Sequence, residues 1–305
     1  MCVNRPRVVD RGGFGSVASD REIGGVVSED RIHRAASIDG TEIVGRVHGV
    51  GPPLVLIHGG LSDGDQAWGP LLAFLEARFT CYLISTRGRG LSAAPADDDY
   101  SLERLVEDVV SFVGGIGQPV GLIGHSLGGA LALGAAADSA AVSAVAVYEP
   151  AVFEAPSEVS PRAEAKGARI GEAVAENRLA EAAREMVEGA VTDDEMAAIS
   201  RAGVLESWAT NVRVALREAQ QAGESQRPTP TDASALKRID VPVLYLHGSQ
   251  TPTTWYREGA RHVADHVADF RQVEVVGAAH LTPHLVPELI ADELIQFFEA
   301  VPEPA

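Results

Sequence analysis

The sequence predicts an α/β protein whose mostly parallel sheet carries a helical insert, and three observations lead to this prediction. Short apolar runs alternate with helical patterns through residues 31–152 and again from 236 onward, which is typical of βα units. Residues 153–235 are rich in Ala, Glu and Arg and show helical periodicity without a strand pattern. Residues 124–129 read Gly-His-Ser-Leu-Gly-Gly, between an apolar run and an Ala-rich helical stretch.

The individual elements follow from local patterns. Short apolar runs predict strands at 43–48, 54–57, 81–85, 119–123, 144–148, 243–247 and 273–276. Helical spacing predicts helices at 68–78, at 130–137, at 287–298 and after Ser101, whose hydroxyl suits an N-cap. Thr192 and Glu195 have the spacing of a capping box at the start of a helix in the insert.

Composition limits the classes of partner. The chain has 305 residues and a formal net charge of −18, which argues against nucleic acid or an anionic membrane as a partner. Cys2 and Cys81 are the two cysteines, and we expect no disulfide and a cytoplasmic location. No metal-ligand spacing and no membrane-spanning stretch is found in the sequence. We therefore expect no metal and no membrane association.

We expect three regions along the chain. Residues 1–30 carry arginines but no apolar stretch, so they do not match a secretory signal and are predicted to be a flexible tail. Residues 31–152 and 236–305 are predicted to form the α/β core. Residues 153–235 are predicted to form a helical cap over the sheet.

Ser126 is the candidate nucleophile. A serine at the apex of a sharp strand-to-helix turn, flanked by Gly124 and Gly128, is the arrangement called a nucleophile elbow. The glycines are needed because a Cβ would collide with the neighbouring strand or helix in so tight a turn. The turn lifts the serine hydroxyl off the sheet, and the new helix directs its positive end at an oxyanion formed there.

A serine hydroxyl needs a general base and two oxyanion donors. His280 follows the last predicted strand on a small-residue loop, which makes it a better base than His58, His125 or His284. We expect His58 to be a buried structural residue and the His125 side chain to diverge from that of the serine. The backbone N–H of Leu127 is one expected oxyanion donor, and that of Gly60, in the loop after strand 54–57, is the other.

These residues resemble those of the α/β-hydrolase superfamily over about residues 35–300. The resemblance rests on the 124–128 elbow, on His58-Gly59-Gly60, on the 87–92 loop Arg-Gly-Arg-Gly-Leu-Ser and on the late Gly277-Ala278-Ala279-His280. It implies an eight-stranded, mostly parallel sheet flanked by helices, with an antiparallel edge formed by the first strands. It also implies a helical cap between the sixth and seventh strands, where residues 153–235 fall, and no cofactor.

The chain departs from the family pattern at the acid. The family's usual acid follows the seventh strand in a Gly-x-x-Asp pattern, but Thr251 stands in that place here. Glu149, directly after the sixth strand, is the strongest substitute, although it could instead be an exposed residue that starts the cap. Some haloalkane dehalogenases and the zearalenone lactone hydrolases place their acid there, and the resemblance to the latter extends to Thr251-Pro252-Thr253 and Trp208. A second departure replaces the usual Asp before Arg87 by Thr86, for which we expect only local consequences.

The sequence thus predicts a serine hydrolase that cleaves an apolar carboxylic ester or lactone through an acyl-enzyme, with Ser126, His280 and Glu149 as the triad. Trp208 and Leu61 are the candidate substrate-binding residues, although Trp208 suits the core of the cap equally well. A cofactor-free haloperoxidase or C–C bond hydrolase on the same triad and a receptor-like, non-catalytic binding protein are the alternatives. The expected partner is a small apolar molecule, and a homodimer is left open.

Overall fold

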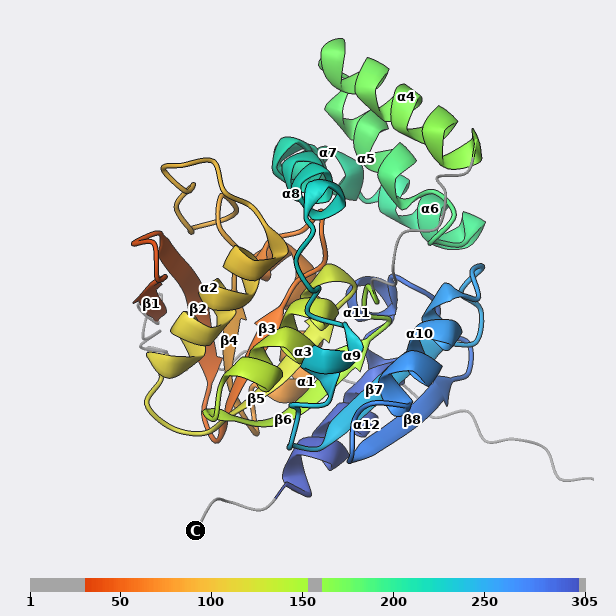
Figure 1. Cartoon of the computed structure of the whole chain (residues 1–305). Helices are drawn as coiled ribbons and strands as arrows, with labels where there is room; N and C mark the ends of the chain where they lie inside the picture. Colours follow the sequence, from red (N-terminus) through yellow and green to blue (C-terminus); the bar gives the residue numbers. More distant parts are fainter. Residues whose placement is uncertain (1–30, 153–160, 302–305) are drawn as a thin grey trace, which may run out of the picture.

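A computed structural model of the protein describes residues 31–152 and 161–301. They form an eight-stranded sheet with helices on both faces and a further group of helices above one edge (Figure 1). The predicted N-terminal tail, residues 1–30, lies outside the described residues.

The sheet has the strand order β1-β2-β4-β3-β5-β6-β7-β8. Its first two pairings, β1 with β2 and β2 with β4, are antiparallel, and all the others are parallel. The strands are β1 Ile32–Ala36, β2 Glu42–Gly49, β3 Pro53–Ile57, β4 Thr80–Ile84, β5 Val120–His125, β6 Val142–Tyr148, β7 Val243–Gly248 and β8 Phe270–Val275. The predicted fold class, including the antiparallel edge, is confirmed.

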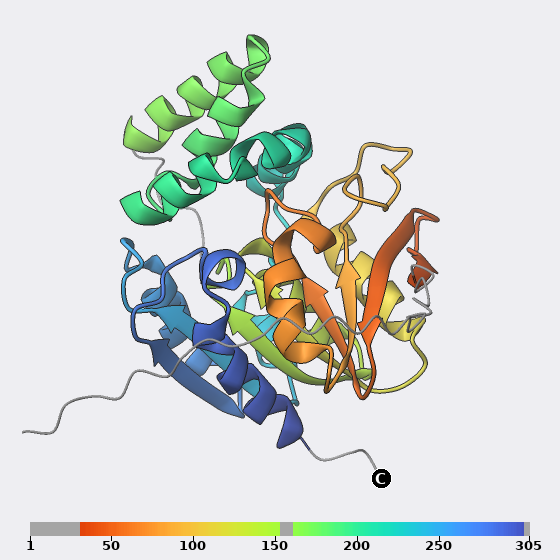
Figure 2. The same ribbon diagram turned by 180° about the vertical axis from the view of Figure 1, so that it is seen from behind.

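Two apolar layers bury the two faces of the sheet. Successive side chains of β6 alternate between them, because strand side chains point to opposite faces: Val145 and Val147 enter one layer, and Ala144, Ala146 and Tyr148 enter the other. The first layer is covered by α2 Leu102–Gly114, α3 Leu127–Asp138, α9 Ala233–Leu236 and α10 Trp255–Ala264. The second is covered by α1 Gly64–Leu75 and α12 Glu288–Glu299, which face the viewer in Figure 2.

The helices that follow β6 form the region that we call the cap, residues 161–224. They are α4 Pro161–Ala175, α5 Leu179–Val187, α6 Asp193–Arg201, α7 Val204–Trp208, the 3-10 helix η1 Ala209–Asn211 and α8 Val212–Glu224. Both halves of the predicted capping box form at α6, where Thr192 and Glu195 exchange hydrogen bonds. Figure 1 shows the cap above the sheet, and its apolar cluster includes Leu61 and Leu281 from loops that follow β3 and β8. The exact limits of the cap as a separate domain stay a prediction.

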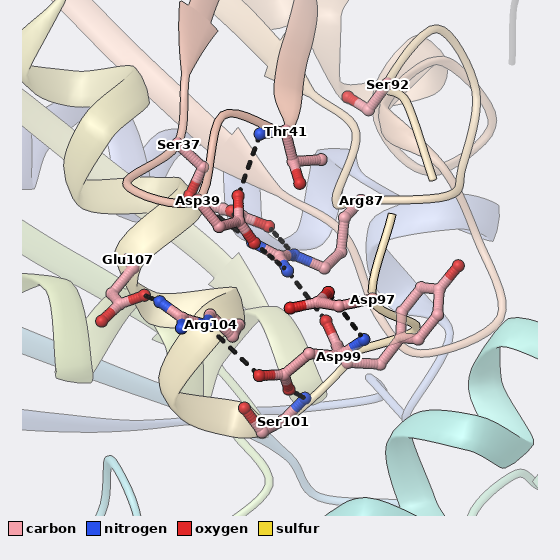
Figure 3. Close-up of polar contacts among 12 residues, drawn as sticks. Ser37, Asp39, Thr41, Arg87, Ser92, Asp97, Asp99, Ser101, Arg104 and Glu107 are labelled. Atoms are coloured by element: carbon pink, nitrogen blue, oxygen red, sulfur yellow. Dashed lines mark hydrogen bonds and ion pairs between the residues drawn. The ribbon is translucent and has the colours of Figure 1, made fainter. Parts of the chain in front are cut away.

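A buried arginine fixes the loop that follows β4. Arg87 donates two hydrogen bonds to the Asp108 carboxylate on α2, at 2.7 and 2.6 Å, and one to Asp39 in the β1–β2 turn at 2.8 Å. It also donates to the Asp99 carbonyl, and Figure 3 shows the convergence on this guanidinium. Two carboxylates compensate the buried cation, and these contacts tie the loop after β4 to α2 and to the β1–β2 turn.

No helix within the described residues is both long enough and apolar enough to span a bilayer.

Candidate active site

Ser126 stands at a strained turn between β5 and α3. Its backbone angles are φ 54° and ψ −120°, a region that L-residues rarely adopt. Neighbouring backbone holds it there, because its N–H donates to the Tyr148 carbonyl at 3.1 Å and its own carbonyl accepts from Ala151 N–H at 2.9 Å. The sharp turn between a strand and a helix is thus the one that the sequence predicts.

The flanking glycines are required by close backbone approach. A Cβ at Gly124 would lie 2.4 Å from the Gly128 carbonyl oxygen, and a Cβ at Gly128 would lie 2.2 Å from the carbonyl oxygen of Ile57. Both distances are far below van der Waals contact, and backbone atoms cannot give way as a flexible side chain can. The elbow therefore tolerates no larger residue at either position.

His280 and Glu149 form a buried pair beside this turn. The imidazole Nδ1 lies 2.8 Å from Glu149 Oε2, and the two residues are 6% and 0% exposed. Glu149 also has a positive φ of 43°, which is uncommon for a residue with a side chain. An exposed acid at the start of the cap, the alternative interpretation, does not match this burial.

The second oxygen of Glu149 explains the threonine in the family's usual acid position. Oε1 accepts hydrogen bonds from Gly248 N–H at 2.9 Å and from Thr251 Oγ1 at 2.6 Å. The carboxylate thus accepts three hydrogen bonds in a water-poor environment, which compensates the cost of burying its charge. Thr251 supplies a donor to the acid and does not replace it.

The pairing also sets the tautomer of the imidazole. A carboxylate accepts only, so Nδ1 carries the proton and Nε2 of a neutral His280 keeps its lone pair. Ser126 and His280 both line a cavity of about 350 Å³. This arrangement can accept a proton from a hydroxyl in the cavity, although the catalytic roles of the three residues stay predictions.

The two expected oxyanion donors lie close together. Gly60 and Leu127 both line the cavity, and a Cβ at Gly60 would lie 3.9 Å from the Leu127 side chain. Leu127 is the first residue of α3, so its N–H belongs to the unpaired donors at the helix N-terminus. An oxyanion bound here would also be stabilised by the helix dipole.

Contacts with side chains of the cap hold the loops that carry these groups, in one case through Arg89 of the loop after β4. Arg89 Nη2 donates to the Gly60 carbonyl at 2.5 Å, and the same guanidinium forms a buried ion pair with Glu218 on α8. Asn211 Nδ2 donates to the Leu61 carbonyl at 3.0 Å. Glu195 Oε1 accepts from the N–H of Leu281, next to His280, at 2.6 Å. None of these contacts was predicted, because each joins segments that are far apart in the sequence.

The competing histidines have other partners. His58 Nδ1 donates to the Gly59 carbonyl at 2.8 Å and its Nε2 accepts from Thr86 N–H at 3.0 Å, while burial and the charge of Arg89 lower its pKa to about 3. It is buried, as expected. His125 Nε2 donates to the His280 carbonyl at 2.9 Å, and the two rings lie 4.7 Å apart. The His125 side chain thus packs against the His280 ring and does not point away from the site.

Trp208 and Leu61, the two candidate substrate-binding residues, both line the cavity. They also belong to the apolar cluster of the cap, so Trp208 is at once a core residue and part of the cavity wall. The sequence reasoning missed Trp255 and Tyr256, which line the same cavity from the start of α10. Two adjacent aromatic residues soon after a strand end were the available signal.

The cavity wall is mainly aliphatic and aromatic. Within the described part of the chain no lysine or arginine lines it, and its carboxylate, Glu218, is paired with Arg89. The described residues include no group of three or more His, Cys, Asp or Glu residues that could hold a metal ion.

Comparisons with known proteins find similarity to several hydrolases. Protein phosphatase methylesterase 1 of Mus musculus is 37% identical over 93 residues, which are 28% of this chain and 24% of that protein. An alpha/beta hydrolase from Sphaerobacter thermophilus DSM 20745 has a TM-score of 0.71 at 28% identity, covering 87% of this chain and all of that one. The esterase RhEst1 from Rhodococcus sp. ECU1013 has a TM-score of 0.68 at 25% identity, over 89% and 99% of the two chains.

The chain thus spans only about a quarter of the length of the curated methylesterase that it matches. A sequence profile of the alpha/beta hydrolase family, in contrast, matches residues 54–293, which include the elbow, the cap and the His280 loop. Because this match covers most of the chain, the protein belongs to the alpha/beta hydrolase family.

Proposed function

We propose that the protein is a serine hydrolase that cleaves an uncharged, apolar carboxylic ester or lactone through an acyl-enzyme. The observation that carries this proposal is the buried Glu149–His280 pair at 2.8 Å, which lies at the same cavity as the elbow serine. A methylesterase and an esterase among the similar proteins support ester chemistry.

In the proposed reaction, His280 Nε2 takes the proton of Ser126 as its oxygen attacks the carbonyl carbon. The N–H groups of Gly60 and Leu127 stabilise the oxyanion, at about 3 kcal/mol of transition-state free energy for each donor. The imidazolium then protonates the leaving oxygen, and water hydrolyses the acyl-enzyme by the same sequence of proton transfers. Glu149 holds the imidazole in its reactive tautomer and stabilises its positive charge.

The wall of the cavity supports an uncharged substrate. Apolar side chains such as Leu102, Met186 and Val187 line it, and Glu218, the one carboxylate among the described lining residues, is neutralised by Arg89. A substrate carboxylate or phosphate would lose its hydration without gaining a cationic partner from the described lining, which costs free energy.

The Ser126→Ala variant tests the proposal, with hydrolysis of p-nitrophenyl butyrate as the assay. We expect kcat to fall by about 10⁴-fold or more, while the circular dichroism spectrum and melting temperature stay close to those of the wild type. Unchanged hydrolysis by this variant would exclude Ser126 as the nucleophile and with it the acyl-enzyme.

A further inference from the structure

Tyr256 places its hydroxyl group beside Nε2 of His280, the nitrogen that takes part in the proposed proton transfer. Its ring is stacked on the imidazole, with centroids 4.9 Å apart and planes inclined by 14°. Its hydroxyl oxygen lies 3.4 Å from Nε2. No role for this residue follows from the triad or the oxyanion donors.

The fold holds Tyr256 firmly in this position. Tyr256 is the second residue of α10 and is 4% exposed. Its backbone carbonyl accepts a hydrogen bond from the Tyr245 hydroxyl at 2.6 Å. Tyr245 itself is a fully buried residue of β7. The hydroxyl of Tyr256 is therefore a fixed part of the cavity, which its side chain lines together with Ser126.

The contact with Nε2 leaves this hydroxyl available to a ligand. A distance of 3.4 Å is longer than that of a normal hydrogen bond from a hydroxyl, and such contacts are weak. Burial, together with the charges of Glu149 and Glu195, raises the pKa of the phenol above its ordinary value. The group is thus a neutral donor, and a phenylalanine would provide the same stacking without burying a poorly paired hydroxyl.

We propose that the Tyr256 hydroxyl donates a hydrogen bond to the leaving-group oxygen of the substrate while His280 protonates that oxygen. In this step the bond between the carbonyl carbon and the leaving oxygen breaks, and its electron pair stays on the oxygen. The proton moves from Nε2 to the same oxygen, and Tyr256 keeps its own proton. The inference rests on the proposed function, because it concerns the acylation step of that reaction.

The consequence is a preference for one class of leaving group. An alkoxide is strongly basic and needs a proton and a hydrogen-bond donor as it departs, whereas p-nitrophenolate is a weak base and departs without either. The hydrogen bond from the Tyr256 hydroxyl to the leaving oxygen should therefore accelerate the cleavage of aliphatic esters and lactones. It should have little effect on the cleavage of activated aryl esters.

Two butyrate esters and the Tyr256→Phe variant test this inference. Ethyl butyrate and p-nitrophenyl butyrate form the same acyl-enzyme, so kcat/KM compares acylation by two leaving groups. Tyr256→Phe keeps the stacked ring and removes one oxygen atom. Tyr82→Phe, in β4, is the matched control, because the Tyr82 ring packs against His33 and Phe112 and is not among the residues that line the cavity.

For ethyl butyrate we expect Tyr256→Phe to lower kcat/KM by about tenfold, the effect of losing one hydrogen bond in the transition state. For p-nitrophenyl butyrate we expect kcat/KM to stay close to the wild-type value, and for Tyr82→Phe both values to be unchanged. The ratio of the two kcat/KM values is measured in one preparation, so it does not depend on the fraction of correctly folded protein.

An equal loss on both esters would mean that Tyr256 only positions the imidazole, and no loss on either would mean that its hydroxyl takes no part. Either result overturns the inference while leaving the proposed function intact. If the wild-type protein hydrolyses neither ester, the proposed function itself fails, and the inference fails with it.

Discussion

Replacing Glu149 by glutamine is the sharpest test of the acid, because the structure predicts which way the new amide would face. Glu149 Oε2 accepts from His280 Nδ1, while Oε1 accepts from the backbone N–H of Gly248 at 2.9 Å and from the Thr251 hydroxyl at 2.6 Å. The Gly248 N–H can only donate. The amide oxygen of Glu149→Gln must therefore occupy the Oε1 position. The opposite orientation would bury the amide NH₂ against the Gly248 N–H, which costs about 1–3 kcal/mol in the free energy of unfolding.

This orientation places the amide NH₂ against His280. Nδ1 would then have to accept a hydrogen bond, which moves the proton of the neutral imidazole to Nε2. An imidazole in this tautomer has no lone pair for the proton of Ser126. The equivalent change of acid to amide in a Ser-His-Asp triad lowers kcat by about 10⁴-fold through the wrong tautomer, which is about 5 kcal/mol of activation free energy.

The assay is kcat for p-nitrophenyl butyrate, together with the melting temperature of each variant. Glu195→Gln is the matched control, because it neutralises another buried carboxylate, one that contacts the Leu281 N–H but not the imidazole. We expect Glu149→Gln to lose about 10⁴-fold in kcat. In Glu195→Gln the amide NH₂ must face the N–H of Thr192 or of Leu281, which should lower the free energy of unfolding by about 1–3 kcal/mol. Its kcat should stay within about tenfold of the wild type, because the His280 imidazole keeps its tautomer. A Glu149→Gln enzyme with most of its activity, or an equal loss in both variants, would refute the tautomer argument.

Three further perturbations follow from the contacts around the site. Thr251→Ala removes one of the three hydrogen-bond donors to Glu149 and should lower kcat by about tenfold. The loss should be no larger, because two donors remain. A normal kcat would show that this hydroxyl does not contribute. Arg89→Met leaves Glu218 buried without its cation and should lower the free energy of unfolding in urea by about 3–5 kcal/mol; adding Glu218→Gln should restore part of it, and no restoration would contradict the pairing. Burial lowers the pKa of His58 to about 3 and that of His284 to about 4, both below the ordinary 6.5. Between about pH 4 and 6.5 these histidines are protonated in the unfolded chain but neutral in the folded protein, so the unfolded chain binds more protons. The free energy of unfolding should therefore fall as the pH drops below about 6.5, by up to about 1.4 kcal/mol per pH unit for each histidine. Urea unfolding curves that do not shift between about pH 7 and 4.5 would contradict this.

The sequence predicts best what depends on neighbouring residues. The elbow around Ser126 follows from two glycines and one strand-to-helix transition, and the capping box at Thr192 follows from a spacing of three residues. The position of Glu149 could be inferred because parallel strands end at one edge of the sheet, so a residue just after β6 lies beside the end of β5. These inferences need only local geometry and the order of the strands.

Contacts between distant segments could not be predicted in the same way. Glu195 shows the difference within one side chain, since Oε2 makes the predicted capping contact while Oε1 reaches Leu281, far along the chain. Tyr256 likewise contacts His280 only because of where α10 packs. Strand β1 (Ile32–Ala36) was missed for a different reason: it is a half-exposed edge strand that contains His and Arg, so it lacks the apolar run by which buried strands are recognised.

Thr251 and Glu149 are best understood as one arrangement at the ends of two adjacent strands. β6 and β7 are parallel neighbours, and the Thr251 hydroxyl lies 2.6 Å from the Glu149 carboxylate. An aspartate at 251 would therefore place a second negative charge in contact with the first, and two buried carboxylates at this distance cannot both stay ionised. Once the acid follows β6, the loop after β7 must contribute neutral groups. Two such groups follow β7, the Thr251 hydroxyl at the Glu149 carboxylate and the Tyr256 hydroxyl, from the start of α10, near His280 Nε2. Under the proposed mechanism, the missing Gly-x-x-Asp pattern therefore reflects a relocated acid and not a lost one.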